Sequence, residues 1–252
     1  MIDAHLHSSA RPVEDFKLMK MSGVSCVVSC AYDALRMRRS NVCLEHFDKL
    51  VYDEPKRLMT QNMKMLTAIG IHPRAIPEDY NNVINNMGSY LNESNVVAIG
   101  EIGLEVASSI EQEVFIEQLR YADENNINVI VHTPRKNKKE ITQKTIELID
   151  ENIDGKLVQL DHIDNSIIDL VIDKNYTLAI TVQPLKMSVD DTVELLDKYG
   201  YDKFMIDSDV SYAPSDPLSL PKLKHALELN DTKKSDVAKV LTDNAKKFHK
   251  LS

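Results

Sequence analysis

The sequence lacks any long apolar run. A helix that crosses a bilayer needs about 18 or more consecutive apolar residues, and no such stretch occurs in the 252 residues. The chain also lacks the basic segment that opens a secretory signal peptide, because "MIDAHL" at its start already has the pattern of a strand. We therefore expect a cytoplasmic protein that does not contact a membrane.

An excess of basic residues is also missing. The chain has 30 Lys and Arg against 39 Asp and Glu, which gives a formal net charge of −9. Proteins that coat nucleic acids usually carry a basic surface, so we expect no broad nucleic-acid-binding face. A single phosphate-bearing substrate is still compatible with this charge, because bound cations can dominate the field inside a local site.

Cysteines are few: Cys26, Cys30 and Cys43. An odd number is typical of a reducing compartment, and the stretch "VSCVVSC" is interpreted as a buried strand with two small apolar side chains on one face. Linkers, low-complexity tracts and obvious internal repeats are absent as well. We therefore expect a single domain over residues 1–252, a length that is normal for one α/β barrel.

What the sequence does contain is a regular alternation of short apolar, β-branched runs with amphipathic stretches. The expected strands are eight: residues 1–6, 24–30, 64–71, 95–102, 127–133, 156–162, 176–182 and 203–209. Expected helices cover residues 13–23, 108–126, 191–200 and 234–252, and the first and third of these end in glycine.

This alternation predicts an α/β fold with a parallel sheet that helices cover. Closed into a cylinder, the eight strands form a (β/α)8 TIM barrel. An open, doubly wound sheet is the structural alternative.

Six of the eight expected strands end in histidines or carboxylates. These residues are His5, His7, His72, Glu101, His132, Asp161, His162, Asp207 and Asp209. All strands of a parallel barrel end on the face that carries the active site, so we expect these side chains to converge there. Asp207 is expected to support a neighbouring residue or to cap an element. His46, His225 and His249 lie on other stretches and are expected to be solvated.

The pattern predicts a metal site, because burying so many ionisable groups without a metal would be costly. His5 and His7 are two residues apart, so both point to the same side of a strand and can bind one ion. Glu101 lies between Gly100 and Gly103 in "AIGEIGL", which leaves space beside it. Its carboxylate can bridge two divalent ions about 3.5–4 Å apart. Zn, Mn, Ni or Mg are the candidate metals.

At this point the sequence resembles the TatD-like metal-dependent hydrolases of the amidohydrolase superfamily, and within them an archaeal-type branch of predicted barrel hydrolases. The resemblance is carried by "DAHLH", "GIHP", "VVAIGEIGLE", "QEVFIEQLRYADENNINVIVHTPR", "DH", "IDSD" and "DNAKKF". It implies a TIM barrel with a two-metal centre. One metal is then held by His5, His7 and Asp209, the other by His132 and His162, and Glu101 bridges them. Members of this family include DNases and phosphodiesterases.

The sequence departs from the family pattern in three places. Strand eight usually carries Glu-Thr-Asp followed by Ala-Pro, and here it reads "DSDVSYAP". The strand-five histidine is usually followed closely by arginine, and here "HTPR" places Arg135 three residues on. The wider superfamily often bridges its metals with a carboxylated lysine, and no lysine stands at this strand end. The resemblance therefore extends to the metal site more than to the substrate pocket.

We expect metal-assisted hydrolysis of a phosphoester, either a nucleic-acid end or a small phosphodiester. Glu101 and Asp209 are the expected catalytic residues, with Asp209 accepting a proton from the attacking water. His72 and Arg135 are expected to contact the developing negative charge, with a structural histidine and a surface ion pair as their alternatives. Two other functions stay open: hydrolysis of a small amide, lactone or cyclic ester, and a non-catalytic barrel that binds a metal and a partner.

Overall fold

The computed structural model describes residues 1–32 and 36–251 and contains eight parallel strands in a nearly closed barrel. Each strand pairs with the next along the chain, from β1 to β8. The strands are β1 (Ile2–Leu6), β2 (Cys26–Cys30), β3 (Lys64–Ile69), β4 (Val96–Gly103), β5 (Val129–His132), β6 (Val158–Leu160), β7 (Thr177–Thr181) and β8 (Phe204–Asp207). All eight predicted strands are present, a few residues shorter than expected at one or both ends in most cases.

The first and last strands meet at their carboxyl ends. The backbone N–H of Asp209 donates to the His5 carbonyl at 3.0 Å, and that of His7 donates to the Val210 carbonyl at 2.9 Å. These hydrogen bonds join the segment after β8 to β1, so the predicted barrel is confirmed and the open sheet is wrong. Strands that close on each other in this way leave no free sheet edge at this end.

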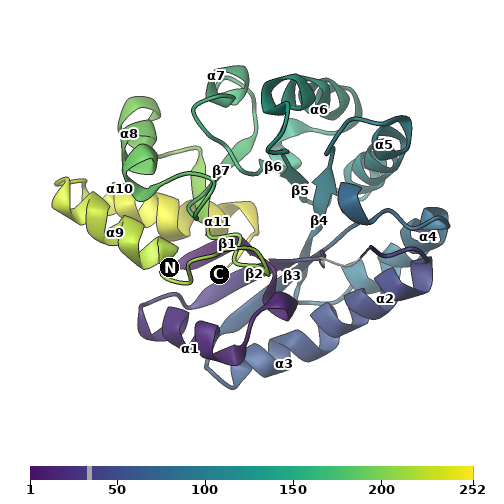
Figure 1. Cartoon of the computed structure of the whole chain (residues 1–252), viewed down its shortest axis with the longest axis horizontal. Helices are drawn as coiled ribbons and strands as arrows, with labels where there is room; N and C mark the ends of the chain where they lie inside the picture. Colours follow the sequence, from purple (N-terminus) through teal and green to yellow (C-terminus); the bar gives the residue numbers. More distant parts are fainter. Residues whose placement is uncertain (33–35, 252) are drawn as a thin grey trace.

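Helices lie outside the ring of strands (Figure 1). They are α1 (Val13–Met21), α2 (Ser40–Asp48), α3 (Glu54–Met59), α4 (Tyr80–Leu91), α5 (Ser109–Glu124), α6 (Lys138–Asn152), α7 (Ile168–Val171), α8 (Val189–Tyr199), α9 (Ser219–Leu229), α10 (Lys234–Ala238) and α11 (Asn244–Phe248). Short π-helical segments, Lys49–Asp53 and Lys239–Asp243, join α2 to α3 and α10 to α11. The predicted helix over 234–252 is therefore α10, a π-helical segment and α11 in succession.

Local signals set the ends of the helices that the sequence predicted. The Ser108 hydroxyl accepts the Glu111 backbone N–H and caps α5. Gly200 follows α8 with a φ of 86°, which a glycine adopts without steric cost. Buried aromatic side chains such as Phe16 of α1 and Phe115 of α5 then pack in one hydrophobic cluster with strand residues such as Val27.

Two of the expectations on single residues are wrong. His46 and His249 are buried, at 8% and 5% exposure, although the sequence predicted solvated side chains. His249 directly follows α11 and its ring lies edge-on to Phe248, so the end of the helix turns it inward. His225 is exposed and Cys26 and Cys30 are buried in β2, as expected. Within the described residues, no helix is both long and apolar enough to cross a membrane.

Candidate metal centre

The carboxyl ends of the strands bring the predicted polar residues together. Buried side chains converge there from six strands: His5, His7, His72, Glu101, His132, Asp161, His162, Asp207 and Asp209. Six of these side chains line one pocket: His7, His72, Glu101, His132, His162 and Asp209. Arg135 lines the same pocket at its exposed rim. The structure thus brings the predicted residues together at one end of the barrel, and their roles stay predictions.

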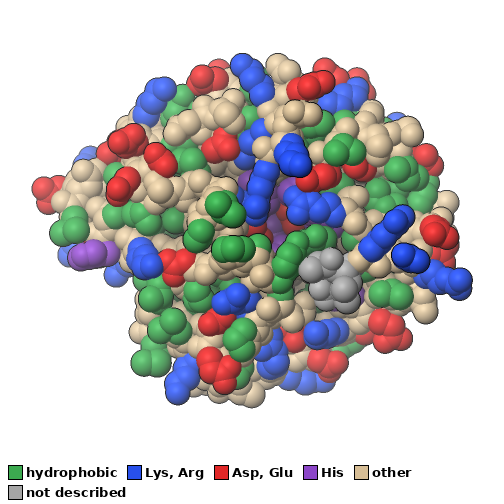
Figure 2. Space-filling model, viewed as in Figure 1, with side chains coloured by type: hydrophobic (Ala, Val, Ile, Leu, Met, Phe, Trp, Pro, Cys, Tyr) green, Lys and Arg blue, Asp and Glu red, His purple; other side chains and the backbone are tan. Residues whose placement is uncertain are grey.

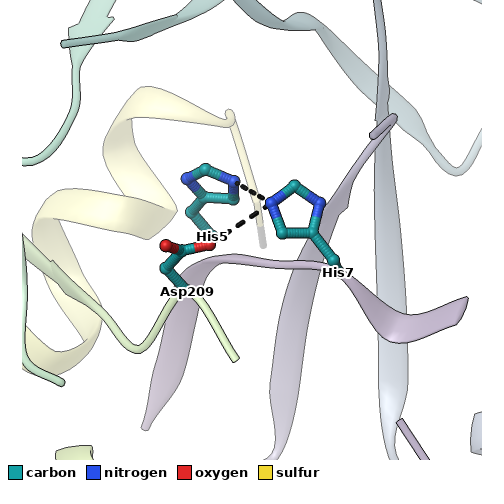
Figure 3. Close-up of side chains that lie close together, drawn as sticks. All are labelled: His5, His7 and Asp209. Atoms are coloured by element: carbon teal, nitrogen blue, oxygen red, sulfur yellow. Dashed lines mark hydrogen bonds and ion pairs between the residues drawn. The ribbon is translucent and has the colours of Figure 1, made fainter. Parts of the chain in front are cut away.

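His5, His7 and Asp209 point toward one another (Figure 3). The His5 Nε2 and His7 Nε2 atoms are 3.3 Å apart, and His7 Nε2 lies 3.3 Å from Asp209 Oδ1. These three donors come from the first and last strands of the barrel. Two imidazole nitrogens and one carboxylate oxygen at this spacing are a donor set that suits Zn, Mn or Ni.

Hydrogen bonds on the far side of each ring determine which nitrogen faces the site. His5 Nδ1 lies 2.6 Å from the Asp161 Oδ2, and His7 Nδ1 lies 3.1 Å from the Cys30 carbonyl oxygen. Both partners accept hydrogen bonds, so both Nδ1 atoms carry the proton in the neutral rings. In neutral rings both Nε2 atoms then face the site with a free lone pair. A divalent cation can accept both lone pairs, so the residues present fit a metal.

Glu101 lies between two groups of histidines. Its Oε1 is 2.9 Å from His132 Nδ1 and 3.1 Å from His162 Nε2. Its Oε2 is 3.5 Å from the Nε2 atoms of His5 and His7. One oxygen thus faces each of the two histidine pairs, which is the arrangement that a bridging carboxylate requires.

Electrostatics keep the Glu101 carboxylate charged. Burial alone would raise the pKa of Glu101, but the neighbouring histidines His5 and His132 outweigh this effect and hold the pKa well below its ordinary value. The same holds for Asp209, whose pKa is held low by Lys186 and His7 despite burial. Two buried, ionised carboxylates among imidazoles are suitable ligands for cations.

His72 stands beside this centre in a fixed orientation. Its Nδ1 accepts the backbone N–H of Arg74 at 3.0 Å, which leaves the Nε2–H directed to Glu101 Oε2 at 3.5 Å. Its ring stacks on Tyr32 with 4.1 Å between the centroids. Burial lowers the pKa of His72 well below its ordinary value, so the ring is neutral. A neutral donor at the pocket wall is compatible with substrate contact.

Asp207 is the last residue of β8 and is completely buried. Neither carboxylate oxygen has a hydrogen-bond partner among the described residues. Burial raises the pKa of Asp207 well above its ordinary value, and the nearby Asp161 adds to this effect. Its oxygen lies close enough to His5 and His162 that the three could share one ion. The described residues show no hydrogen bond by which Asp207 would cap an element, and its support of the neighbouring His5 and His162 stays a prediction.

Three contacts at the site were not predicted. Glu105 accepts a hydrogen bond from His132 Nε2 at 2.9 Å and pairs with Arg74 at 2.9 Å. The Lys186 Nζ lies 2.6 Å from Asp209 Oδ2. Glu105 stands in the motif "GEIGLE", which could have singled it out. Lys186 lies in the loop after β7, and no motif marks it.

The pocket is acidic and histidine-rich at its base and basic at its rim. Figure 2 shows a central hollow with histidine and acidic side chains at the bottom and Lys and Arg side chains around it. The basic lining residues are Arg74, Arg135, Lys138 and Lys186. The hollow encloses about 830 Å³, a figure that includes space open to solvent.

Two residues of the site have strained backbone. His162 has a φ of 61° and Asp209 a φ of 42°, in the left-handed region that L-residues rarely adopt. Such conformations cost of order 1–3 kcal/mol each and persist only where the surroundings enforce them. At both positions the strain turns a potential ligand toward Glu101 or His7.

Comparisons with known proteins agree with this geometry. The sequence model of the family described as TatD related DNase matches residues 2–250. A protein of Methanocaldococcus jannaschii, described as an uncharacterized metal-dependent hydrolase, is 34% identical over 253 residues that cover 100% of both chains. The crystal structure of a TatD-like protein from Archaeoglobus fulgidus has 31% identity and a TM-score of 0.85 over 100% of both chains. The phosphotriesterase homology protein of Escherichia coli, complexed with phosphate in its active site, shares the fold, with 14% identity, 98% coverage of both chains and a TM-score of 0.70.

Proposed function

This chain belongs to the TatD family of metal-dependent hydrolases, and from that premise we propose that it hydrolyses phosphoesters with two divalent metal ions. His5, His7 and Asp209 would hold one metal, and His132 and His162 the other. Glu101 would bridge them, since each of its oxygens faces one group of histidines. Metal ions bound there would polarise the scissile group and lower the pKa of the attacking water to about 7.

The side chains of the protein itself supply the proton transfer and the orientation. Asp209 can accept the proton of the attacking water, because its side chain is ionised and lines the pocket. Asp161 fixes the His5 ring through Nδ1. His72 presents a neutral N–H at the pocket wall, where it can donate to an oxygen that gains negative charge.

The observation that carries the phosphoester proposal is the charge of the pocket rim. The protein has a net charge of −9, yet four basic side chains surround the opening above the histidines. Basic side chains around a metal centre favour an anionic substrate. Among the described residues Arg135 forms no ion pair, and it is exposed at the rim, where it can contact a phosphate.

The substrate that we propose is a small phosphodiester or the end of a nucleic acid. The family description names a DNase, which supports phosphodiester chemistry. The acidic charge of the whole chain disfavours contact with a long polyanion outside the pocket. We propose further that the protein acts in the cytoplasm, because its three cysteines are free and buried.

A hydrolase of small lactones, amides or cyclic esters is the second candidate. The same arrangement of ligands would activate water against a carbonyl carbon as well as against phosphorus. The non-catalytic barrel that binds a partner is a weaker third candidate, because all six proposed metal ligands are present and close together.

The test measures metal content and hydrolysis together. Purified protein that has not met a chelator is analysed for transition metals, then assayed on bis-p-nitrophenyl phosphate, on short DNA and on a panel of lactones. We expect about two metals per chain, as in two-metal hydrolases, and phosphodiester turnover that His5→Ala abolishes. Turnover of lactones alone would favour the second candidate, and an absence of metal after incubation with Zn and Mn would exclude both.

A further inference from the structure

We propose that Lys186 binds the anionic group of the substrate and makes the site selective for phosphoesters over neutral esters. Lys186 lies in the loop between β7 and α8 and lines the pocket, where its side chain is about 10% exposed. Its Nζ is 2.6 Å from Asp209 Oδ2 and 2.9 Å from His162 Nδ1. The proposal rests on the proposed function for its substrate class.

The loop holds this lysine by backbone contacts. The Lys186 N–H donates to the Gln183 carbonyl at 3.2 Å, and the Met187 N–H donates to the Thr181 carbonyl at 3.2 Å. Between them Leu185 has a φ of 72°, which turns the chain sharply. A lysine in such a turn keeps its backbone position over the pocket, while its long side chain can move.

Lys186 differs from the other basic residues of the rim in its ion-pair partner. Arg74 pairs with Glu105 and Lys138 pairs with Asp164, and neither carboxylate belongs to the six proposed metal ligands. The ion-pair partner that the structure gives Lys186 is Asp209, which does belong to them.

Metal binding therefore changes the surroundings of Lys186 more than those of Arg74 or Lys138. Once Asp209 binds a metal, its negative charge is shared with that ion, and the ammonium group loses much of its attraction to the carboxylate. The substrate's phosphoryl oxygens are then the anionic groups nearest to Lys186 in the pocket. A neutral ester offers no charge for this contact, which gives the lysine its selectivity.

The first test is the binding of inorganic phosphate to the metal-loaded protein, measured by calorimetry. We expect Lys186→Gln to weaken phosphate binding by about 10- to 100-fold, as for loss of a charged hydrogen bond, while Lys186→Arg retains most of the affinity. Lys222 of α9 provides a matched control, because it pairs with Asp216 and does not line this pocket. Lys222→Gln is expected to bind phosphate like the wild type.

The second test compares substrates and metal content. Lys186→Gln is expected to raise KM for bis-p-nitrophenyl phosphate by a larger factor than it changes KM for p-nitrophenyl acetate, with metal content at least equal to that of the wild type. Unchanged phosphate affinity in Lys186→Gln, failure of the wild type to bind phosphate, or loss of metal from the variant would each overturn the proposal. If the wild type binds phosphate through Lys186 but hydrolyses no phosphoester, the proposed function is wrong and the anion site stands.

Discussion

Replacing Asp161 by Asn tests whether a hydrogen bond behind His5 prepares the site for metal. Asp161 is completely buried, and its Oδ2 lies 2.6 Å from His5 Nδ1. Its other oxygen accepts the Gln159 side-chain N–H at 2.8 Å. In the variant the new amide oxygen at position 161 can still accept a hydrogen bond from His5 Nδ1. The amide nitrogen then faces the Gln159 Nε2, so two hydrogen-bond donors point at each other.

Gln159 can resolve this conflict by turning its own amide over. Its Oε1 has no hydrogen-bond partner among the described residues, so the turned side chain would accept the hydrogen bond that it now donates and would lose only the long contact, 3.4 Å, from its Nε2 to the Ala4 carbonyl. The variant therefore keeps its shape and loses mainly the negative charge behind His5. Loss of such a partner costs about 10- to 100-fold in metal affinity, or about 1.4–2.7 kcal/mol.

The assay is competition with a chromophoric chelator for Zn, on wild-type protein and Asp161→Asn at the same pH. Asp197→Asn is a matched control, because Asp197 accepts hydrogen bonds from Tyr201 and Asn230 at an exposed position. Circular dichroism establishes that both variants are folded. Equal zinc affinity in the wild type and Asp161→Asn would refute the argument that Asp161 sets the protonation of the His5 ring.

Three further predictions concern charge, packing and pH. Glu101→Gln is expected to reduce the bound metal from about two per chain to one or none, measured by elemental analysis, and an unchanged metal count would contradict the bridging role. Gly100→Ala places a Cβ 2.7 Å from the Ile130 Cβ and is expected to lower the free energy of unfolding by about 1–3 kcal/mol, measured in urea. Burial lowers the pKa of His249 from 6.5 to about 4, so the unfolded chain takes up a proton first as the pH falls. The free energy of unfolding therefore falls by about 3 kcal/mol as the pH is lowered from 6.5 to about 4. The free energy of unfolding is measured against pH in metal-free protein. His249→Leu should remove this loss of stability, and the control His225→Gln should keep it. The same pH dependence in the wild type and both variants would show that His249 does not titrate in this way.

The fold was predictable because its strands are short, apolar and separated by amphipathic stretches. A buried parallel strand needs apolar side chains on both faces, so "VSCVVSC" and "NVIVH" indicate strands without help from the rest of the chain. The helical turns around the π-helical segments were harder to predict, because the widened turns break the regular spacing of apolar residues.

The site was predictable where it consists of strand ends and unpredictable where it depends on loops. His132 and Glu101 follow apolar runs, and the barrel topology alone places such ends together. Lys186 reaches Asp209 only because the loop after β7 turns toward β8, which no local pattern shows. The burial of His249 likewise depends on how the last helix packs on the barrel.

The hydrogen bonds that join β1 to the segment after β8 have a consequence for the order of events during synthesis. His5 and His7 leave the ribosome about 200 residues before Asp209. Their donor atoms can meet only after β8 has closed on β1, so a nascent chain cannot complete this set of ligands early. An ion that binds the closed barrel in preference to open forms then stabilises the junction between β1 and the segment after β8. Metal binding to His5, His7 and Asp209 would thus follow closure of the barrel, and only chains that have closed it would bind the ion at this set of ligands.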